Sequence, residues 1–323
     1  MRVLLTGAAG FIGSHVCERL LERGDQVVAV DSLDAYYSPN RKRQTLAALR
    51  EHPAARRRLH VHEHDVCDGA AMKSLLSEHD IDAIAHLAGL PGVRNSVREA
   101  QRYCEVNLGG TLSLLEAARA HRLRGAFVFA STSSVYGDTA CTPFSESDPC
   151  DRPLAPYPAS KRSAELYGYT YHHLHRLQFT ALRFFTVYGP RNRPDMMAHM
   201  VLDHLYHGRR LKLFGDGQLK RDWTFVSDVA AGVVAALDRP FGYEIFNIGR
   251  GEPVLLANFI EQIEALAGLR AQFEHAPMPP TDMEETYADI ERAVKLLDYR
   301  PRVALEEGAR QLFEWYQTLR PQD

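Results

Sequence analysis

A tyrosine and a lysine stand four residues apart in the segment Tyr157-Pro158-Ala159-Ser160-Lys161. At the start of a helix, this spacing places both side chains on one face. A free tyrosine has a pKa near 10, and lowering it by about three units requires roughly 4 kcal/mol of phenolate stabilisation. A nearby lysine ammonium supplies part of that energy, so the spacing predicts a tyrosine that acts as a general base. The same spacing also arises by chance on a helix, so the neighbouring motifs must decide whether this pair is catalytic.

A run of hydroxyl side chains precedes this pair, at Ser131, Thr132, Ser133 and Ser134. The run follows an apolar segment, 126–130, which has the composition of a buried strand. Doubly wound sheets bind ligands at the carboxyl ends of their strands, so these hydroxyls are placed to share or relay protons. The alternative interpretation is a turn rich in serine and threonine that simply ends a strand.

Three glycines, Gly7, Gly10 and Gly13, lie between the first apolar segment and the first helical pattern. Gly7 suits a tight turn, Gly10 lets the backbone approach a pyrophosphate, and Gly13 allows close packing of helix on strand. The helix that begins at Phe11 and Ile12 then directs its N-terminus at the phosphates. This context favours a dinucleotide site over an ordinary strand-to-helix turn.

Asp31 ends the second strand segment about twenty residues after the glycines, where a carboxylate accepts both ribose hydroxyls of an adenosine. It would repel a 2′-phosphate, so we expect NAD as the cofactor; the nearby Arg41 and Lys42 argue the other way. Further cofactor contacts are expected where later strands end, at Asp65, Val66, Leu87, Ala88 and Gly89.

These groups need a scaffold that brings the ends of several strands together. Apolar, β-branched segments at 2–5, 26–30, 81–87, 126–130, 180–185 and 244–248 alternate with helical patterns at 11–23, 107–121 and 157–177. Such alternation predicts parallel strands joined by right-handed crossovers. The expected fold class is therefore α/β, a doubly wound parallel sheet of the Rossmann type.

The second part of the chain has a different texture. Beyond about residue 189, proline and glycine interrupt the pattern, and a last helical stretch follows at 305–319. We expect residues 1–188 to form a NAD-binding domain to which a segment of about 224–248 returns. The rest of 189–323 is expected to form a smaller lobe that binds the substrate.

Composition excludes several classes of protein. With 323 residues, 45% of them hydrophobic, the chain buries a large core and is neither disordered nor fibrous. Its 38 basic and 41 acidic residues are scattered, which argues against nucleic-acid binding. We find no apolar run of membrane-spanning length and expect no signal segment before the first strand. The five cysteines are irregularly spaced, which is typical of a protein in a reducing compartment. We expect a cytoplasmic protein without a metal site, since no histidine has ligand spacing.

Nearly the whole chain resembles the extended short-chain dehydrogenase/reductases, and within them the UDP-glucuronate 4-epimerases. The matching segments are TGAAGFIGSH, HLAG, PGVRNS, NLGGT from Asn107, STSSVYG, YPASK, LRFFTVYGPRNRPDM, FGDGQLKRDWTFVSDVA and EIFNIG. The resemblance implies that Thr132 is the hydroxyl partner of Tyr157 and that Lys161 binds the nicotinamide ribose. It places Asn107 at the cofactor, and implies a homodimer through the helices at 107–121 and 157–177. The residues it places at a nucleotide sugar are Arg94, Arg193, Arg221 and Asp282.

Three positions separate the chemistries within this family. Dehydratases carry an Asp-Glu pair after the catalytic threonine, because loss of water needs a further acid and base. This chain has Ser133 and Ser134 there, so it also lacks the glutamate of the decarboxylating relatives. Many relatives that act on neutral sugars have asparagine in place of Thr186. These three hydroxyls are neutral donors suited to a carboxylate, so the expected substrate is a UDP-hexuronic acid.

The expected reaction interconverts UDP-glucuronate and UDP-galacturonate through oxidation at C4, rotation of a 4-keto intermediate and re-reduction. A neutral UDP-hexose is one alternative, because a hydroxyl-lined pocket also accepts a hydroxymethyl group. A decarboxylase that shares the first step is a second. A NAD-sensing scaffold without activity is a third, since fold does not fix function, but Thr132, Tyr157 and Lys161 argue against it.

Overall fold

The computed structural model describes residues 1–139, 141–215 and 218–319. Within these residues, a central sheet of seven strands has the order β10-β6-β5-β4-β1-β2-β3. The strands are β1 Arg2–Thr6, β2 Gln26–Asp31, β3 Leu59–Glu63, β4 Ala83–His86, β5 Ala126–Thr132, β6 Gln178–Phe184 and β10 Tyr243–Ile248. All their pairings are parallel, which confirms the α/β fold class predicted from the alternation of segments.

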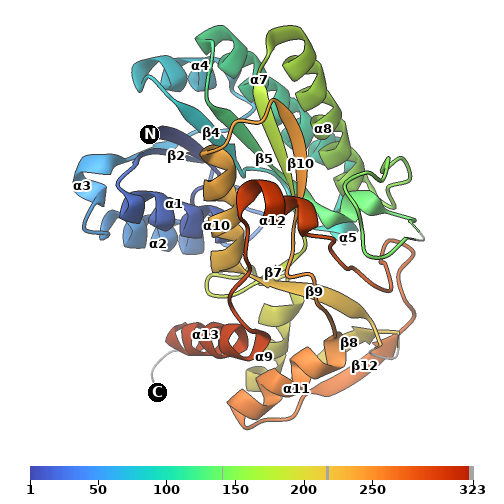
Figure 1. Ribbon diagram of the computed structural model, residues 1–323. Helices are drawn as coiled ribbons and strands as arrows, with labels where there is room; N and C mark the ends of the chain where they lie inside the picture. The colour runs from blue at the N-terminus through green and yellow to red at the C-terminus, as the bar shows by residue number, and fades with distance from the viewer. Residues whose placement is uncertain (140, 216–217, 320–323) are drawn as a thin grey trace.

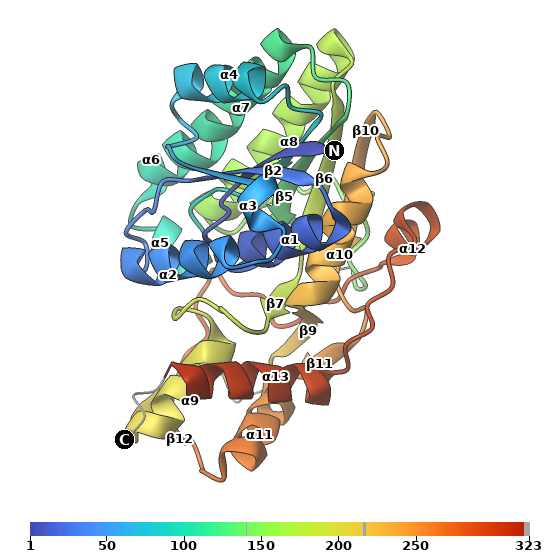
Figure 2. The same cartoon turned by 90° about the vertical axis from the view of Figure 1, so that its left-hand side faces the viewer.

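Helices cover both faces of this sheet, which is why its inner strands are apolar throughout. Every residue of β5 is buried, for example. One face packs against α1 (Phe11–Arg23), α2 (Pro39–Arg50) and α10 (Val226–Leu237), and the other against α4 (Gly69–Glu78), α7 (Gly110–His121) and α8 (Pro156–His175) (Figures 1 and 2). In the described ranges, no helix has both the length and the apolar character needed to cross a bilayer.

Short helical segments surround the carboxyl ends of the strands. They are α5 (Val93–Ser96), α6 (Ala100–Tyr103), the π-helical turn η1 (Cys104–Gly109) and the 3-10 turn η2 (Ser133–Tyr136), whereas α3 (Ala55–Arg58) leads into the amino-terminal end of β3. The helix expected at 107–121 therefore begins inside η1 and continues as α7. Its π-helical entry accommodates one more residue per turn, which hydrophobic periodicity does not reveal.

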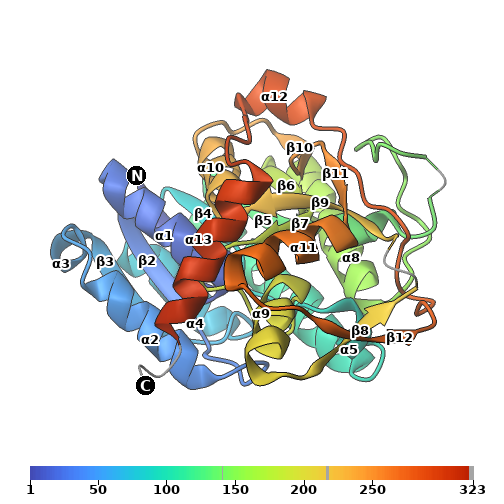
Figure 3. The ribbon, with the colours of Figure 1, turned by 90° about the horizontal axis from the view of Figure 1, so that it is seen from below.

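The second lobe, below the central sheet in Figure 1, is built in the described residues from small sheets and the helices α9, α11 and α13. Strands β7 (Thr186–Tyr188), β9 (Lys220–Phe225) and β11 (Pro253–Leu255) form one sheet, and β8 (Arg210–Phe214) pairs with β12 (Gln272–Ala276). The bounds of these helices are α9 (Met197–His207), α11 (Leu256–Ala267) and α13 (Leu305–Thr318), whereas α12 (Glu291–Leu297) packs against β10 and α10 of the central sheet. Seen from below, α11 lies beside α13 (Figure 3). β7, at the end of the stretch predicted as the first domain, pairs with β9 in this small sheet.

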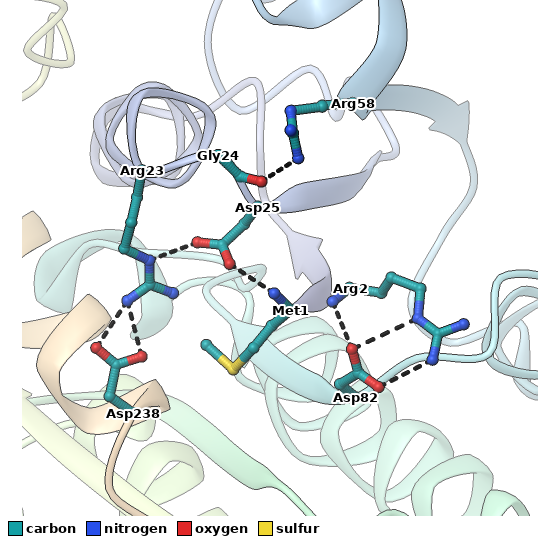
Figure 4. Close-up of polar contacts among 8 residues, drawn as sticks. All are labelled: Met1, Arg2, Arg23, Gly24, Asp25, Arg58, Asp82 and Asp238. Carbon is teal, nitrogen blue, oxygen red and sulfur yellow. Dashed lines mark hydrogen bonds and ion pairs between the residues drawn. The ribbon is translucent and has the colours of Figure 1, made fainter.

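Ion pairs close the amino-terminal end of the sheet (Figure 4). The Met1 amino group donates to Asp25 (2.8 Å), and Arg23 bonds both Asp25 (2.5 Å) and Asp238 (2.7 Å). Asp238 caps the C-terminal end of α10, so these contacts tie α1 to α10. They lie at the opposite end of the strands from the carboxyl ends, where the functional groups gather.

Candidate active site

The loop between β1 and α1 is shaped by its glycines. Gly7 has a φ of +72°, which disfavours any residue with a side chain. A Cβ atom on Gly13 would lie 2.0 Å from the Gly7 carbonyl oxygen, so helix and loop touch through bare backbone. Gly10 caps α1 without a side-chain hydrogen bond, which leaves the first amides of the helix open to an anion.

A cavity extends along the carboxyl ends of the strands from this loop. Its wall contains every residue predicted to contact the cofactor except Asn107: Gly7, Gly10, Phe11, Ile12, Gly13, Asp31, Asp65, Val66, Leu87, Ala88, Gly89, Tyr157 and Lys161. We refer to it as the cofactor cavity. The bare glycine loop at one end and Asp31 in the wall have the shape and donor set that a dinucleotide requires.

Asn107 lies behind this cavity and is buried. Its side chain accepts from the Leu90 amide (2.7 Å) and donates to the Leu90 carbonyl (3.0 Å) and to Ser160 Oγ (3.1 Å). Asn107 Oδ1 lies 2.9 Å from the position that a Cβ atom on Gly89 would occupy. Asn107 therefore fixes the loop after β4 from behind the cavity wall, and its contact with the cofactor stays a prediction.

Asp31 is held by the backbone on both sides. One carboxylate oxygen accepts from the Ala9 amide (3.0 Å) and the other from the Leu33 amide (2.8 Å). Burial raises its pKa, and the Lys42 ammonium opposes that rise. Lys42 also lines the cavity, but its Nζ donates to the Asp34 carbonyl (2.8 Å). Of the two basic residues that argued for a 2′-phosphate, Arg41 and Lys42, the ammonium of Lys42 is thus already engaged.

The catalytic candidates converge where β5 meets α8. Tyr157 stands in the first turn of α8 and shares a side-chain hydrogen bond with Thr132, the last residue of β5. Lys161 lies one turn later, and its Nζ donates to the Ala130 carbonyl (2.9 Å). Burial lowers the pKa of Lys161 to about 8, opposed by Glu165, so this amine is still mainly charged at neutral pH.

The electrostatics of Tyr157 differ from the prediction. In the protein alone, burial raises the pKa of Tyr157, and the two groups that lower it are the Thr132 hydroxyl and the Arg193 guanidinium. The sequence pointed to Lys161 as the perturbing cation, because only that residue is close to Tyr157 along the helix. Arg193 comes from the loop between β7 and α9 and is brought near by the tertiary fold.

A second cavity adjoins the first, on the side of the smaller lobe. It is lined by Arg94, Ser133, Ser134, Thr186, Arg193, Arg221 and Asp282, all predicted to contact the substrate. Thr132, the remaining candidate, borders it and donates to Ser134 Oγ (3.2 Å). We refer to it as the substrate cavity. Tyr36 and Arg193 line both cavities, so the two spaces meet at these side chains.

Cations dominate the far part of the substrate cavity. Arg94 pairs with Asp282 (2.5 Å) and lies 4.1 Å from the centre of the Phe214 ring. Arg221 donates to the carbonyls of Lys220 (2.8 Å) and Glu284 (3.1 Å), and Lys212 completes the set. Guanidinium and ammonium groups in this number suit a diphosphate.

Several residues that line this cavity were absent from the predicted set, among them the polar and aromatic side chains of Tyr36, Asp195, Lys212 and Phe214. Phe214 and Asp195 lie inside segments that carry the family resemblance, but nothing local indicates their contacts. Tyr36 offered one signal, an aromatic residue shortly after a strand that ends in Asp31. Among the described residues, no group of three or more His, Cys, Asp or Glu is arranged to hold a metal ion. His86 bonds the hydroxyls of Thr6 (2.8 Å) and Thr111 (3.0 Å).

Comparisons with known proteins agree with this geometry. The sequence profile of the NAD dependent epimerase/dehydratase family matches residues 3–249. The chain is 39% identical to a UDP-glucuronate 4-epimerase of Thermodesulfobacterium geofontis, over 97% of this chain and 95% of the relative. A crystal structure of the UDP-glucuronic acid 4-epimerase of Bacillus cereus, in complex with UDP-glucuronic acid and NAD, superposes with a TM-score of 0.90 at 35% identity, covering 99% of this chain and 100% of that one. A UDP-glucose 4-epimerase of Thermotoga maritima with UDP-glucose gives 0.89 at 30% identity, covering 99% of both chains.

Proposed function

The chain belongs to the NAD dependent epimerase/dehydratase family, and from this premise we propose that it interconverts UDP-glucuronate and UDP-galacturonate by oxidation and re-reduction at C4. The observation that carries the proposal is the meeting of the two cavities beside Tyr157, with neutral hydroxyl donors on the substrate side. The ligands of the Bacillus cereus enzyme, UDP-glucuronic acid and NAD, support the same pair here.

The cofactor cavity would hold NAD with its pyrophosphate at the glycine loop, its adenosine ribose at Asp31 and its nicotinamide ribose at Lys161. When bound, NAD accepts a hydride from C4 of the sugar and later returns it to the opposite face. Lys161 is anchored through the Ala130 carbonyl, so it presents its charge from a fixed position.

Tyr157 acts as the base and the acid of the cycle. As a phenolate it takes the proton of the 4-hydroxyl, and after the sugar has turned it gives a proton back to the 4-keto oxygen. Thr132 stabilises the phenolate by its hydrogen bond, and the Arg193 charge does so through space. Meanwhile Arg94, Arg221 and Lys212 retain the UDP part, about whose diphosphate the sugar rotates.

The hydroxyl donors have a second task. A 4-ketohexuronate is a β-keto acid, which loses carbon dioxide readily. Hydrogen bonds from Ser133, Ser134 and Thr186 would hold and stabilise its carboxylate, and so restrain that loss.

The proposal is tested by incubating the purified protein with UDP-glucuronate, UDP-galacturonate, UDP-glucose and UDP-galactose, and identifying products by NMR. Interconversion of the two uronates is the expected result. A UDP-pentose as the main product would identify a decarboxylase, and turnover of the neutral sugars alone would identify a hexose epimerase. A protein that turns over none of them and releases no NAD on denaturation would be a scaffold.

Asp31→Ala is expected to narrow the preference for NAD over NADP, because it removes the carboxylate that would repel a 2′-phosphate. The affinity for NADP should rise, while that for NAD should fall because the contacts to the Ala9 and Leu33 amides are also lost. Dissociation constants of both dinucleotides, measured by calorimetry on cofactor-free protein, check this.

Asp31→Asn is the matched control, since it removes the charge and keeps one acceptor oxygen. It should narrow the preference as Asp31→Ala does, with a smaller loss of NAD affinity. Wild-type protein that co-purified with NADP would contradict the assignment.

Thr186→Val keeps the shape of the side chain and removes its hydroxyl, so it should affect an acidic substrate more than a neutral one. A hydrogen bond to a charged group contributes roughly 1.5 to 3 kcal/mol, against about 1 kcal/mol for a neutral one. We therefore expect kcat/KM for UDP-glucuronate to fall about tenfold or more, with some UDP-pentose released. Steady-state kinetics with UDP-glucuronate and UDP-glucose measure the difference.

Thr180→Val serves as the control, because Thr180 is a buried threonine of β6 whose hydroxyl has no hydrogen-bond partner in the described structure. It should leave kcat/KM for both sugars nearly unchanged. Equal losses on both sugars in Thr186→Val would show that Thr186 only packs.

We also propose that the protein is a homodimer in the cytoplasm. The exposed apolar side chains Leu166, Tyr167, Tyr169 and Leu174 on α8 support a helical interface, and five free cysteines support a reducing compartment. Sedimentation equilibrium measures the mass; a monomer at micromolar concentration would contradict the dimer.

A further inference from the structure

Arg193 occupies an unusual place between the two ligand spaces. Its side chain lines both the cofactor cavity and the substrate cavity, and only 20% of it is exposed. Its charge lowers the pKa of Tyr157. Yet it belongs to the loop between β7 and α9, and not to the strand and helix that carry the other catalytic groups. Something must hold this guanidinium in place.

Asp195, two residues later, binds the Arg193 guanidinium through both carboxylate oxygens. The Nε–Oδ1 distance is 2.9 Å and the Nη2–Oδ2 distance is 3.1 Å. Burial opposes ionisation of Asp195, but Arg193 and a hydrogen bond from Tyr36 lower its pKa. A bidentate pair of this kind fixes both the position and the plane of a guanidinium.

Tyr36, from the segment that follows β2, in turn holds Asp195 by a hydrogen bond. Its hydroxyl donates to Asp195 Oδ2 (2.9 Å) and accepts from Asn95 Nδ2 (3.0 Å). Burial and the Asp195 charge raise the pKa of Tyr36 to about 12, so it remains a donor at neutral pH. A Cβ on Gly92 would lie 2.3 Å from this hydroxyl, so the backbone of Gly92 leaves the room that the phenol needs.

These contacts form a chain that crosses between the two parts of the protein. Tyr36 follows β2, the strand that ends at Asp31 in the cofactor cavity, whereas Asp195 and Arg193 belong to the loop that opens the smaller lobe. We infer that Asp195 and Tyr36 are positioning residues that hold the Arg193 guanidinium beside Tyr157, an inference that rests on the proposed role of Tyr157 as the base.

The other groups that face Tyr157 are held in position without contacts between the two parts of the protein. Thr132 is the last residue of β5, and Lys161 lies on α8 itself with its Nζ on the Ala130 carbonyl. From α6, the Tyr103 ring approaches edge-on at 6.2 Å, and its hydroxyl donates to the Pro91 carbonyl. Arg193 is thus the charged neighbour of Tyr157 whose position depends on contacts across the two parts.

Tyr36→Phe tests the inference without changing any charge. If this hydrogen bond is lost, Arg193 moves away from Tyr157, whose pKa then rises. We expect the acid limb of the kcat/KM profile to move to higher pH by about half to one unit, so that kcat/KM on that limb falls about threefold to tenfold. The inhibition constant for UDP and the content of bound NAD should stay the same, because the variant leaves Arg94, Arg221 and the glycine loop intact.

Asp195→Asn gives a second test through the sign of the shift. If the carboxylate acted only through its charge, its removal would strengthen the positive field at Tyr157 and move the acid limb to lower pH. If it positions Arg193, the limb moves to higher pH instead, and Asp195→Glu restores part of the wild-type profile. The double variant with Tyr36→Phe should show less than the sum of the two single shifts, since both act on one contact.

A matched pair of controls lies on neighbouring elements. Asp203 on α9 pairs with Arg209 (2.9 Å) and accepts from the Tyr316 hydroxyl (3.4 Å). Asp203→Asn and Tyr316→Phe therefore repeat the same substitutions on an aspartate, arginine and tyrosine set away from the cavities, and the pH profile should not move.

The result that would overturn the inference is a Tyr36→Phe protein, or an Asp195→Asn protein, whose acid limb stays in place or moves to lower pH. The pKa of Tyr157 is also read without turnover, by NMR titration of the holoenzyme with isotope-labelled tyrosine, assigned through Tyr157→Phe. An inactive wild-type protein would thus overturn the proposed function alone, whereas an unshifted Tyr157 resonance in both variants would overturn the positioning role alone.

Discussion

Tyr157→Phe is expected to reduce turnover at least about a hundredfold, the usual scale for loss of a general base, while the protein keeps its NAD. The substitution removes only the oxygen that exchanges a proton with the sugar and preserves the ring that packs near Tyr103. Without that oxygen the 4-hydroxyl keeps its proton, and oxidation at C4 does not proceed. Product formation from UDP-glucuronate, together with NAD released on denaturation, measures both parts.

The control is Tyr167→Phe, the same change on the same helix at an exposed position. It should retain wild-type activity. If Tyr157→Phe kept more than about a tenth of the activity, the base would have to be sought elsewhere, because general-base catalysis contributes more than that.

Glu165→Gln is expected to destabilise the fold by about 3 to 5 kcal/mol, the scale for breaking a buried ion pair. Glu165 and Arg183 are both fully buried; the carboxylate accepts from Arg183 Nε (3.1 Å) and Nη2 (2.9 Å), and from Ser131 Oγ (2.5 Å). The amide keeps the shape but leaves the Arg183 charge without its counter-ion. Denaturant unfolding of wild type and variant under identical conditions measures the loss.

The control for this prediction is Glu307→Gln, which breaks an exposed pair with Arg310 (2.7 Å) and should leave the midpoint unchanged. Acidification should act in the same direction as the Glu165 substitution. Burial opposes ionisation, but Arg183 lowers the pKa of Glu165 below 4.5, so the stabilisation is present above that pH and disappears as the pH falls through the lowered value. A loss below about 1 kcal/mol would place Glu165→Gln among ordinary surface changes.

Local patterns were sufficient for six of the seven strands described in the central sheet and for the groups that these strands and the helices carry. They missed β3, which has no buried residue and therefore no apolar run. The alternation of segments predicted the α/β class, because each strand and its crossover helix form a contiguous stretch of sequence. The glycine loop and the pairing of Tyr157 with Lys161 were visible for the same reason. Each is a short motif whose geometry depends on one turn or one helix.

Contacts between distant parts of the chain were not visible. Tyr36 and Asp195 are separated by 159 residues, and no periodicity or spacing relates them. The sequence placed Arg193 at the nucleotide sugar and missed its effect on Tyr157 for the same reason. The pairing of β7 with β9 could not be predicted either, because a three-residue strand has no preference for one sheet over another. The hydrogen bonds of Asn107 to Leu90 were not visible because a resemblance does not say how an amide is bonded.

The strand order of the central sheet also affects how the chain emerges during synthesis. β6 is completed at Phe184, but its outer neighbour β10 begins only at Tyr243, with much of the smaller lobe between them. At 5 to 20 residues per second, those roughly 60 residues take about 3 to 12 seconds to translate. For that interval β6 is an apolar edge with unpaired backbone amides and carbonyls, the kind of surface that recruits other strands. The nascent chain is therefore most vulnerable to aggregation, and most dependent on chaperones, between the completion of β6 and the arrival of β10.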